Sequence, residues 1–518
     1  MGRVIDRRLS RLLVACALAL VAISRLIWIG RPTLLPDEAY YWEWSRRLDF
    51  GYFDHPPMVA LVIRATTALG GVSEFTVRVG MVALGVGTVA LAYGAGRLLG
   101  GALAGWLCLA AAATCPLFVL LSGLAAPDGP LLFLWAATVY TLLLAVTTGR
   151  GRYWYAAGAL LGLALLSKYV AILLVPSVLL FALLSGGHWL RRREPYLASA
   201  LALLVFSPDI LWNMRHGWLS MSFQLAHGAC HAGSTATGYL LQLAIYVVTQ
   251  ISIVGPLLAL VVGAATVAAL TRGLRRRQDA ALLLACCTLV TSVLFLAVHG
   301  LAHWAAPAYF SAIVCGGVFL ARLLRWGATR GRLAVAALCA AALLSAAFES
   351  AYVVRAVAEG AMIPGPLGQM IEPTLIEPAL RWREVGRQVG RVVTSLEPGA
   401  HGATVLADTY GTAAEVAFYT PGHPWVYSGS NQYKVWGPPP ARAARGPLVF
   451  VSNSGVLAAT GSPLRHGSRL AAALTVRSGG HLVRQLEVTM LPGPADGAAP
   501  GALLAAAWRI AATLCEGS

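Results

Sequence analysis

Long apolar runs recur along the chain up to about residue 353, and they constrain its fold more than any other feature. A helix needs about 20 apolar residues to cross the hydrocarbon core of a bilayer. Runs of that order are found at 12–30, 75–97, 102–122, 130–147, 154–186, 196–213, 238–270, 280–298, 302–323 and 333–353. The composition agrees, because 58% of the residues are hydrophobic and only 12% are charged, whereas a soluble globular chain is about 25% charged. This excludes a soluble enzyme and predicts an α-helical integral membrane protein.

The run at 154–186 determines how the chain is expected to cross the membrane. Arg150 and Arg152 precede it and Arg191–Arg193 follow it, and arginine-rich flanks prefer the cytoplasm. One crossing cannot put both flanks on the same side, whereas two short helices that turn near Ser167, Lys168 and Tyr169 can. Counted in this way, the chain has about eleven transmembrane helices. The basic N-terminus is then cytoplasmic, and the C-terminal third lies on the extracytoplasmic side.

The net charge of +17 reflects how the chain crosses the membrane and does not by itself indicate an anionic ligand. Many arginines lie in short groups between apolar runs, as in the cluster at 272–277, rather than on one accessible face. We therefore expect no nucleic-acid partner. The cysteines are scattered, mostly within apolar runs, without the spacing of a zinc site or a disulfide framework.

The composition changes at about residue 354, where Pro and Gly clusters replace the long apolar runs. Leu380–Leu396 has apolar residues near helical spacing, which predicts a helix. Short apolar runs predict buried strands at Ala403–Ala407 and Leu448–Ser452, with a helix at Thr412–Tyr419 between them. We expect a membrane domain at 1–353, with a large first extracytoplasmic loop at 31–73, and a small soluble α/β domain at 354–518. The last apolar stretch, Ala499–Leu514, is too short and too interrupted to span a bilayer.

The predicted topology gathers unusual ionisable and aromatic residues on the extracytoplasmic side. They lie at Asp37–Trp44, Gly51–Pro57, Asp128, Lys168, Trp212–Trp218, Phe223–His227, and His299, His303 and Trp304. Taken singly, each has an ordinary structural explanation. Asp37 and Asp128 could cap helices, the cations could meet lipid phosphates, and the Trp and Tyr rings could form an interfacial belt.

Together, these residues combine carboxylates that can accept a hydroxyl proton with cations that can hold a phosphate. That combination at one membrane face suits group transfer from a lipid-linked phosphate. The sequence has no phosphate-binding glycine loop, zinc-ligand spacing or serine nucleophile elbow, so nucleotide hydrolysis, zinc proteolysis and esterase chemistry have no support.

Six motifs resemble those of GT-C type membrane glycosyltransferases, and more narrowly the protein O-mannosyltransferase and lipid A aminoarabinose transferase group. They are Asp37-Glu38-Ala-Tyr-Tyr-Trp, Tyr52-Phe53-Asp54-His55-Pro56-Pro57-Met58, Pro127-Asp128-Gly-Pro, Leu-Ser167-Lys168-Tyr169, Leu-Trp212-Asn213-Met-Arg-His216-Gly-Trp218 and His303-Trp304-Ala-Ala-Pro307-Ala308-Tyr309. The resemblance covers about residues 30–325. A weaker similarity follows at 408–419 and 431–433.

The resemblance implies an inverting glycosyltransferase that moves a sugar from a polyprenyl-phosphate carrier to an acceptor hydroxyl of an envelope glycolipid, glycan or protein. The reaction would take place at the extracytoplasmic face of the bacterial inner membrane. Asp37 matches the acidic position that activates the acceptor, Asp128 matches the second acidic position, and Glu38 joins them as a catalytic candidate. Proton removal by Asp37 also fits the chemistry, since the attacking hydroxyl must lose its proton.

The remaining candidates bind the substrates. His55 stands where the aminoarabinose transferases have a lysine, and an imidazole neutralises a phosphate only when it is protonated. Lys168 and Arg215 are therefore expected to help His55 hold the donor phosphate. The candidates for sugar or acceptor binding are Tyr40, Tyr41, Tyr52, His216 and Trp304.

A divalent cation is the one cofactor that the resemblance suggests. Asp54 and His227 match positions where a relative holds such an ion, but two ligands alone do not define an obligatory metal site.

A different class of function, a multi-spanning transporter or flippase of lipid-linked sugars, would also need a basic chain with many spans. Transporters tend to have internal repeats and ionisable groups at the middle of the membrane, and the sequence has neither feature. The glycosyltransferase is therefore the leading hypothesis.

Overall fold

The structure, a computed structural model, describes residues 7–229, 236–298, 300–326, 329–359, 382–395, 403–438, 447–453, 469–478 and 481–491. These residues form two compact units. The first contains the described residues up to Gly30 and those from His55 to Ala358, and the second contains Arg31–Asp54 and the described residues from Trp382 onward. The segment Arg31–Asp54 thus packs with C-terminal residues, although it lies between two apolar runs in the sequence.

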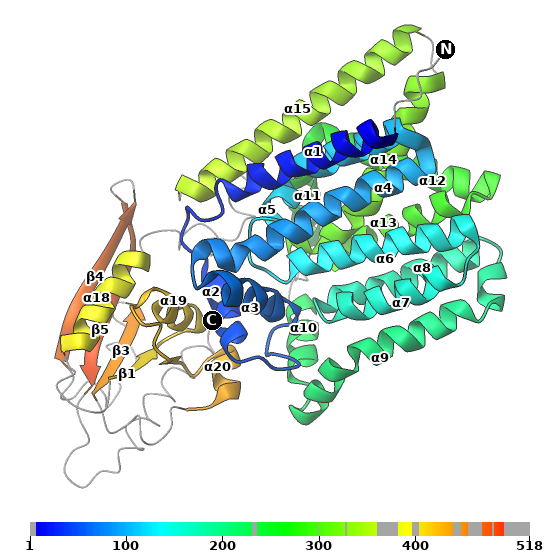
Figure 1. Ribbon diagram of the computed structural model, residues 1–518. Helices are drawn as coiled ribbons and strands as arrows, with labels where there is room; N and C mark the ends of the chain where they lie inside the picture. Colours follow the sequence, from blue (N-terminus) through cyan, green and yellow to red (C-terminus); the bar gives the residue numbers. More distant parts are fainter. Residues whose placement is uncertain are drawn as a thin grey trace. The chain divides into compact units, whose positions relative to one another are not determined.

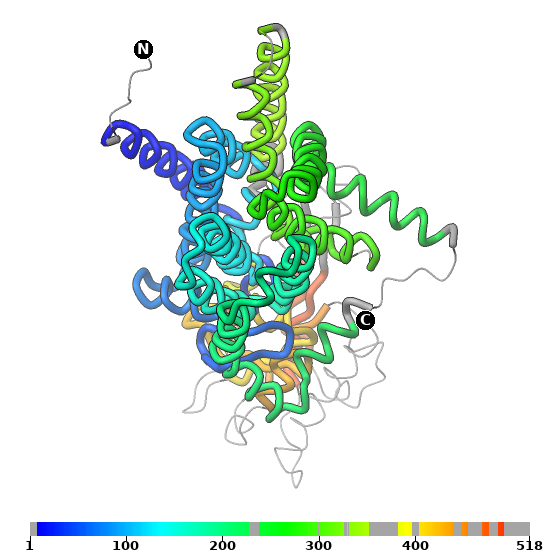
Figure 2. Tube along the Cα trace, turned by 90° about the vertical axis from the view of Figure 1, so that its right-hand side faces the viewer, coloured from blue at the N-terminus to red at the C-terminus, as the bar shows by residue number. Residues whose placement is uncertain are grey.

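The first unit consists of helices, most of which Figure 2 shows nearly end-on in a bundle. They are α1 (Arg7–Leu26), α3 (Met58–Gly70), α4 (Glu74–Thr114), α5 (Pro116–Leu121), α6 (Asp128–Thr148), α7 (Arg152–Leu165), α8 (Leu174–Leu184), α9 (Glu194–Arg215), α10 (Leu219–Ala229), α11 (Ala236–Val254), α12 (Pro256–Arg276), α13 (Asp279–Val298), α14 (Ala306–Trp326) and α15 (Thr329–Glu359). Short 3₁₀ turns lie at Tyr169–Leu173, His188–Arg191 and Ala302–Ala305.

Eight helices of the described part are long and apolar enough to cross a membrane. The prediction of an α-helical integral membrane protein is therefore confirmed, while the count of about eleven spans stays a prediction. Three further helices are apolar but shorter, at Met58–Gly70, Tyr169–Leu184 and Gly238–Val254.

Three of the long apolar runs are interrupted, one at a turn and two at glycines with positive φ. The expected turn at Lys168 is present, because α7 ends at Leu165 and Lys168 has extended backbone (φ −160°, ψ 139°) before the 3₁₀ turn begins. Within α4, Gly101 has φ 75°, which separates the two runs expected at 75–97 and 102–122. The run at 238–270 is interrupted at Gly255 (φ 97°), and Pro256 starts the next helix.

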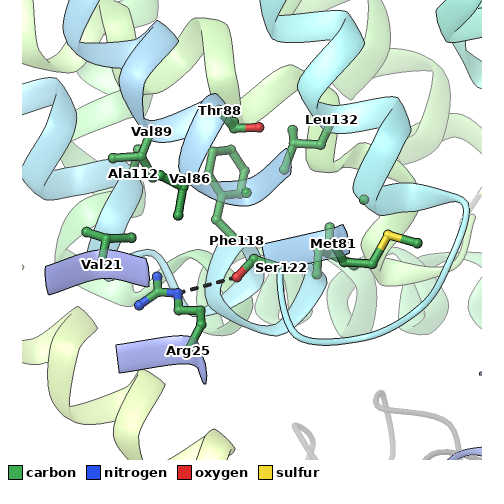
Figure 3. A pocket seen from close by; sticks show the side chains of 13 residues that line it. Val21, Arg25, Met81, Val86, Thr88, Val89, Ala112, Phe118, Ser122 and Leu132 are labelled. Atoms are coloured by element: carbon green, nitrogen blue, oxygen red, sulfur yellow. Dashed lines mark hydrogen bonds between the residues drawn. The ribbon is translucent and has the colours of Figure 1, made fainter. Parts of the chain in front are cut away.

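A buried arginine ties the first helix to the bundle. Arg25, near the end of α1, is 7% exposed. Its Nη2 donates to the Ala113 carbonyl at 2.6 Å and its Nε donates to the Ser122 hydroxyl at 3.4 Å, the second of which Figure 3 shows. Because a buried guanidinium is costly without partners, these bonds fix where α1 lies against α4 and the residues that follow α5.

The second unit is built on a five-stranded sheet with the order β2-β1-β3-β5-β4. The strands are β1 (Thr404–Ala407), β2 (Val426–Tyr427), β3 (Leu448–Asn453), β4 (Arg469–Ser478) and β5 (His481–Leu491). β1 pairs in parallel with β2 and β3, whereas β5 pairs antiparallel with β3 and β4. The predicted strands near 403 and 448 are confirmed, whereas β2, β4 and β5 were not predicted. The stretch 499–514 lies outside the described residues.

The helices of the second unit are α2 (Pro36–Arg46), α18 (Trp382–Ser395), α19 (Tyr410–Tyr419) and α20 (Asn431–Trp436). α18 and α19 pack against each other and against the sheet, as Figure 1 shows, and they confirm the helices expected at 380–396 and 412–419. Gly386 of α18 lets the two helices approach closely, because a Cβ there would lie 2.3 Å from the Tyr419 carbonyl.

α2 packs on α19. The Trp42 ring meets the Phe418 ring edge-on at 4.9 Å, the Leu34 amide donates to the Tyr419 hydroxyl at 2.7 Å, and Arg46 donates to the His423 carbonyl at 2.8 Å. These contacts hold the acidic first-loop motif in a defined structure.

Candidate active site

A buried ion pair lies at the beginning of α6 in the first unit. Lys168 Nζ is 3.0 Å from both carboxylate oxygens of Asp128, and the two side chains are only 5% and 6% exposed. His303 Nε2 lies 3.9 Å from Asp128, and Lys168 lies 6.0 Å from the centre of the Trp304 ring. We call Asp128, Lys168, His303 and Trp304 the ion-pair cluster.

His55 joins the electrostatic surroundings of this cluster. It interacts with the Asp128 charge, and its Nδ1 lies 3.4 Å from the Gln224 amide nitrogen of α10. The structure therefore brings together four of the expected residues, Asp128, Lys168, His55 and Trp304, from segments far apart in the sequence.

A hydrogen-bond network supports the turn that carries Lys168. The Tyr169 hydroxyl lies 3.1 Å from Asp209 Oδ2 and 3.0 Å from Ser220 Oγ, and Asn213 donates to Asp209 Oδ2 at 3.1 Å. Asp209 and Asn213 are fully buried in α9. The sequence analysis missed Asp209, although a carboxylate inside an apolar run is itself a signal.

An acidic cluster forms in the second unit around α2. Asp37 is exposed in the first turn of α2, and its Oδ1 accepts a hydrogen bond from the Tyr410 hydroxyl at 3.0 Å. Asp54 is buried, and it is hydrogen-bonded by Asn431 Nδ2 at 3.3 Å and by the Tyr40 hydroxyl. We call Asp37, Asp54, Tyr40, Tyr410 and Asn431 the acidic cluster.

The electrostatics of the acidic cluster raise the pKa of its buried carboxyl group, Asp54. Burial is the main cause that raises the pKa of Asp54 to about 7; the negative charge of Asp37 contributes to the rise, and the hydrogen bonds from Tyr40 and Asn431 oppose it. Burial, together with the Asp54 charge, raises the pKa of the Tyr40 phenol well above its usual range. Tyr40 is therefore a neutral donor to Asp54, and Asp54 is half-protonated near pH 7.

Several first-loop candidates have clear structural tasks. Glu38 is buried, and its Oε2 accepts a hydrogen bond from the Leu35 amide at 3.0 Å, which caps α2. Tyr41 is buried with its ring 4.9 Å from Trp44, and Tyr52 is buried with its ring stacked on Trp44 at 4.3 Å. The catalytic role of Glu38 and the sugar-binding roles of these tyrosines stay predictions.

Arg215 and His216 lie at the end of α9. Arg215 is exposed, and within the described part of the chain it makes no ion pair. His216 stacks on Trp212 at 4.0 Å, and its Nδ1 lies 2.8 Å from the Trp212 carbonyl. Their proposed binding roles are not tested by this geometry.

The expected cation ligands do not define a site among the described residues. Asp54 is bound within the acidic cluster, and the side chain of His227 lies outside the described part, as does His299. No group of three or more His, Cys, Asp or Glu residues converges in the described ranges.

Part of the chain is similar in sequence to known proteins, and most of it is similar in fold to solved structures. Residues 54–212 match the family described as dolichyl-phosphate-mannose-protein mannosyltransferase. The lipid A galacturonosyltransferase RgtD of Rhizobium johnstonii is 33% identical over 191 residues, which is 35% of this chain and 38% of that relative. The matched region thus spans well under half of the curated relative.

Solved structures resemble the chain over most of its length. ArnT from Cupriavidus metallidurans in the apo state gives a TM-score of 0.61 at 16% identity, covering 92% of this chain and 97% of that one. The same protein bound to undecaprenyl phosphate gives 0.59 at 16% identity with the same coverage. The apo oligosaccharyltransferase of Archaeoglobus fulgidus gives 0.55 at 13% identity, covering 88% of this chain and 71% of that one.

The chain therefore has the fold of the GT-C type membrane glycosyltransferases. The resemblance inferred from the motifs is confirmed at this level, and the likeness at these identities concerns the fold.

Proposed function

We propose that the protein is an inverting glycosyltransferase that moves a sugar from a polyprenyl-phosphate carrier to an acceptor hydroxyl at the extracytoplasmic face of the bacterial inner membrane. Support comes from the family match at 54–212, from a relative named as a lipid A galacturonosyltransferase, and from the ArnT fold, which has been solved with undecaprenyl phosphate. The acceptor hydroxyl would belong to an envelope glycolipid, glycan or protein, as the motifs imply.

The observation that carries the proposal is the accessible carboxylate of Asp37. It is exposed in the first turn of α2, and the Tyr410 hydroxyl orients it from 3.0 Å. Asp37 would accept the proton of the acceptor hydroxyl while its oxygen forms the new bond to the anomeric carbon. The bond from that carbon to the phosphate oxygen breaks, and its electron pair leaves with the carrier phosphate.

The ion-pair cluster is suited to the leaving phosphate. Phosphate is already a good leaving group, so stabilising its charge matters more than protonating it. Lys168 offers an ammonium held in place by Asp128, and His303 and His55 add imidazoles that become cationic on protonation. Trp304 provides an apolar face beside Lys168.

Asp54 would tune the base rather than replace it. Burial raises the pKa of Asp54 to about 7, and the Asp37 charge contributes to this rise, so the two carboxyl groups interact electrostatically. A protonated, neutral Asp54 adds no negative charge beside the Asp37 carboxylate.

The test is release of free polyprenyl phosphate by the purified full-length protein in detergent. Polyprenyl-phosphate-linked sugars are offered one at a time with a crude envelope acceptor, and wild type is compared with Asp37→Asn. Asp49→Asn serves as the matched control, because Asp49 is an exposed carboxylate of the same segment.

We expect release with at least one sugar, a loss of at least about 100-fold in Asp37→Asn, and near-normal turnover in Asp49→Asn. Full activity in Asp37→Asn would refute the role of Asp37. Carrier binding without release by the wild type, in the presence of every acceptor fraction, would favour a transporter.

A further inference from the structure

A cavity lined by several charged residues lies in the first unit, away from the ion-pair cluster. It has a volume of about 400 Å³, and Val146 and Thr147 of α6 contribute to its lining. Asp128 begins α6 and Thr147 lies in its last turn. At 1.5 Å per residue, the two ends of this helix are roughly 28 Å apart. The cavity is thus a separate site, at the end of α6 opposite to Asp128.

Three arginines line this cavity. Arg272 lies in α12, Arg277 directly follows α12, and Arg322 lies in α14. Arg277 adopts a left-handed conformation (φ 49°) at the end of α12, where glycine or asparagine is the usual choice. Arg277 thus ends α12 beside two further arginines of the same cavity.

The charge of the cavity is not balanced from within the protein. Asp279 is the one carboxylate in its lining, and it accepts a hydrogen bond from Trp189 Nε1 at 2.9 Å and pairs with His188 at 3.3 Å. In the described part of the chain, none of the three arginines forms an ion pair. The cavity is therefore poised to accept an anion.

Apart from Thr147 and Gln278, the rest of the lining is largely apolar. Leu99, Leu284, Val318 and Phe319 face the same space, and the Arg272 guanidinium lies 5.8 Å from the centre of the Phe319 ring. A free inorganic anion gains nothing from such a wall, whereas a lipid that carries a phosphate can place its glycerol and upper acyl chains against it. The preference of arginine for cytoplasmic flanks explains why arginines end these helices, but not why three of them line one cavity.

We propose that this cavity binds the phosphate headgroup of an anionic membrane phospholipid, with Arg272, Arg277 and Arg322 as its ligands. The site is independent of sugar transfer, and it would attach the helical unit to one class of lipid at the end that the arginine pattern predicts to be cytoplasmic.

The test is native mass spectrometry of the full-length protein in detergent, titrated with phosphatidylglycerol or with phosphatidylcholine of the same acyl chains. Arg272→Gln and Arg322→Gln each remove one cavity charge. Arg275→Gln is the matched control, because Arg275 lies on α12 and is exposed but does not line the cavity.

We expect wild type to prefer phosphatidylglycerol. Each cavity variant should bind it about fivefold more weakly, and the double variant about 25-fold more weakly, while Arg275→Gln stays within about twofold. Arg272→Lys keeps the positive charge, so it should still bind phosphatidylglycerol. This variant therefore tests the role of the charge even if Arg272→Gln does not fold.

Equal affinity for the two lipids, or equal weakening in Arg275→Gln, would overturn the proposal. Millimolar inorganic phosphate is the second arm. If it displaces phosphatidylglycerol from wild type, the cavity recognises free phosphate, and the assignment to a lipid headgroup is wrong.

Discussion

Breaking the Asp128–Lys168 pair should destabilise the helical unit strongly, whereas replacing both residues together should not. Lys168 Nζ contacts both Asp128 oxygens at 3.0 Å, and both side chains are nearly inaccessible. Solvent therefore cannot compensate a charge that has lost its partner. Lys168→Met leaves a buried carboxylate and Asp128→Leu leaves a buried ammonium, and each change should cost about 3–5 kcal/mol.

The double variant leaves no isolated charge. Apolar side chains of similar volume fill the space, so its stability should be no lower than that of either single variant. The expected coupling free energy between the two positions is then at least about 3 kcal/mol.

The stabilities of wild type, the two single variants and the double variant form a double-mutant cycle. Unfolding by SDS in mixed micelles, followed by tryptophan fluorescence, measures these four stabilities. Arg192→Gln is the control, because the Arg192 side chain is 34% exposed in its pair with Glu194, and it should cost less than about 1 kcal/mol. Additive single variants, with a coupling below about 0.5 kcal/mol, would show that Asp128 and Lys168 do not form a buried pair.

Three further predictions concern the second unit and its packing. Because the pKa of Asp54 is raised to about 7, the folded state holds a proton that the unfolded state loses at lower pH, so stability should fall as pH rises from about 4 to 7. Asp54→Asn should flatten this dependence in thermal unfolding, and parallel pH curves for variant and wild type would contradict it. Tyr40→Phe removes the hydroxyl that accepts the Gln432 amide at 2.8 Å, so denaturation should show a loss of about 1–3 kcal/mol; an unchanged midpoint would disprove the bond's importance. Gly386→Ala would place a methyl group 2.3 Å from the Tyr419 carbonyl and should cost about 1–3 kcal/mol in the same measurement, while Gly331→Ala, with nothing within 4 Å, should be neutral or slightly stabilising.

Features that depend on short stretches of chain could be predicted from the sequence. The length and apolar character of a membrane-crossing helix are local properties, so most helices were expected near where they lie. The turn at Lys168 followed from arginines on both flanks of one apolar run, and the structure has a break there. A helix start was one alternative for the acidic motif, and α2 does begin there, with Leu35 as the N-cap and Pro36, Asp37 and Glu38 in its first turn.

Features that depend on pairing between distant residues were decided by tertiary structure. The sequence placed Asp128, Lys168 and His303 on one side of the membrane, but only packing makes a bonded pair of the first two with the third beside them. β4 and β5 escaped prediction because a strand needs a partner, and β5 finds its partners in β3 and β4.

The packing of Arg31–Asp54 with the C-terminal unit also depends on contacts between residues far apart in the sequence. No local pattern in the segment indicates that Tyr40 accepts the Gln432 amide or that Asn431 binds Asp54, some 377 to 392 positions further along the chain. By itself, the sequence indicated the class of protein and most of its helices, and it offered candidate reactive residues, since hydropathy and residue chemistry act along the chain. Tertiary structure decided which carboxylates are buried, paired or exposed, because burial depends on every segment that packs around them.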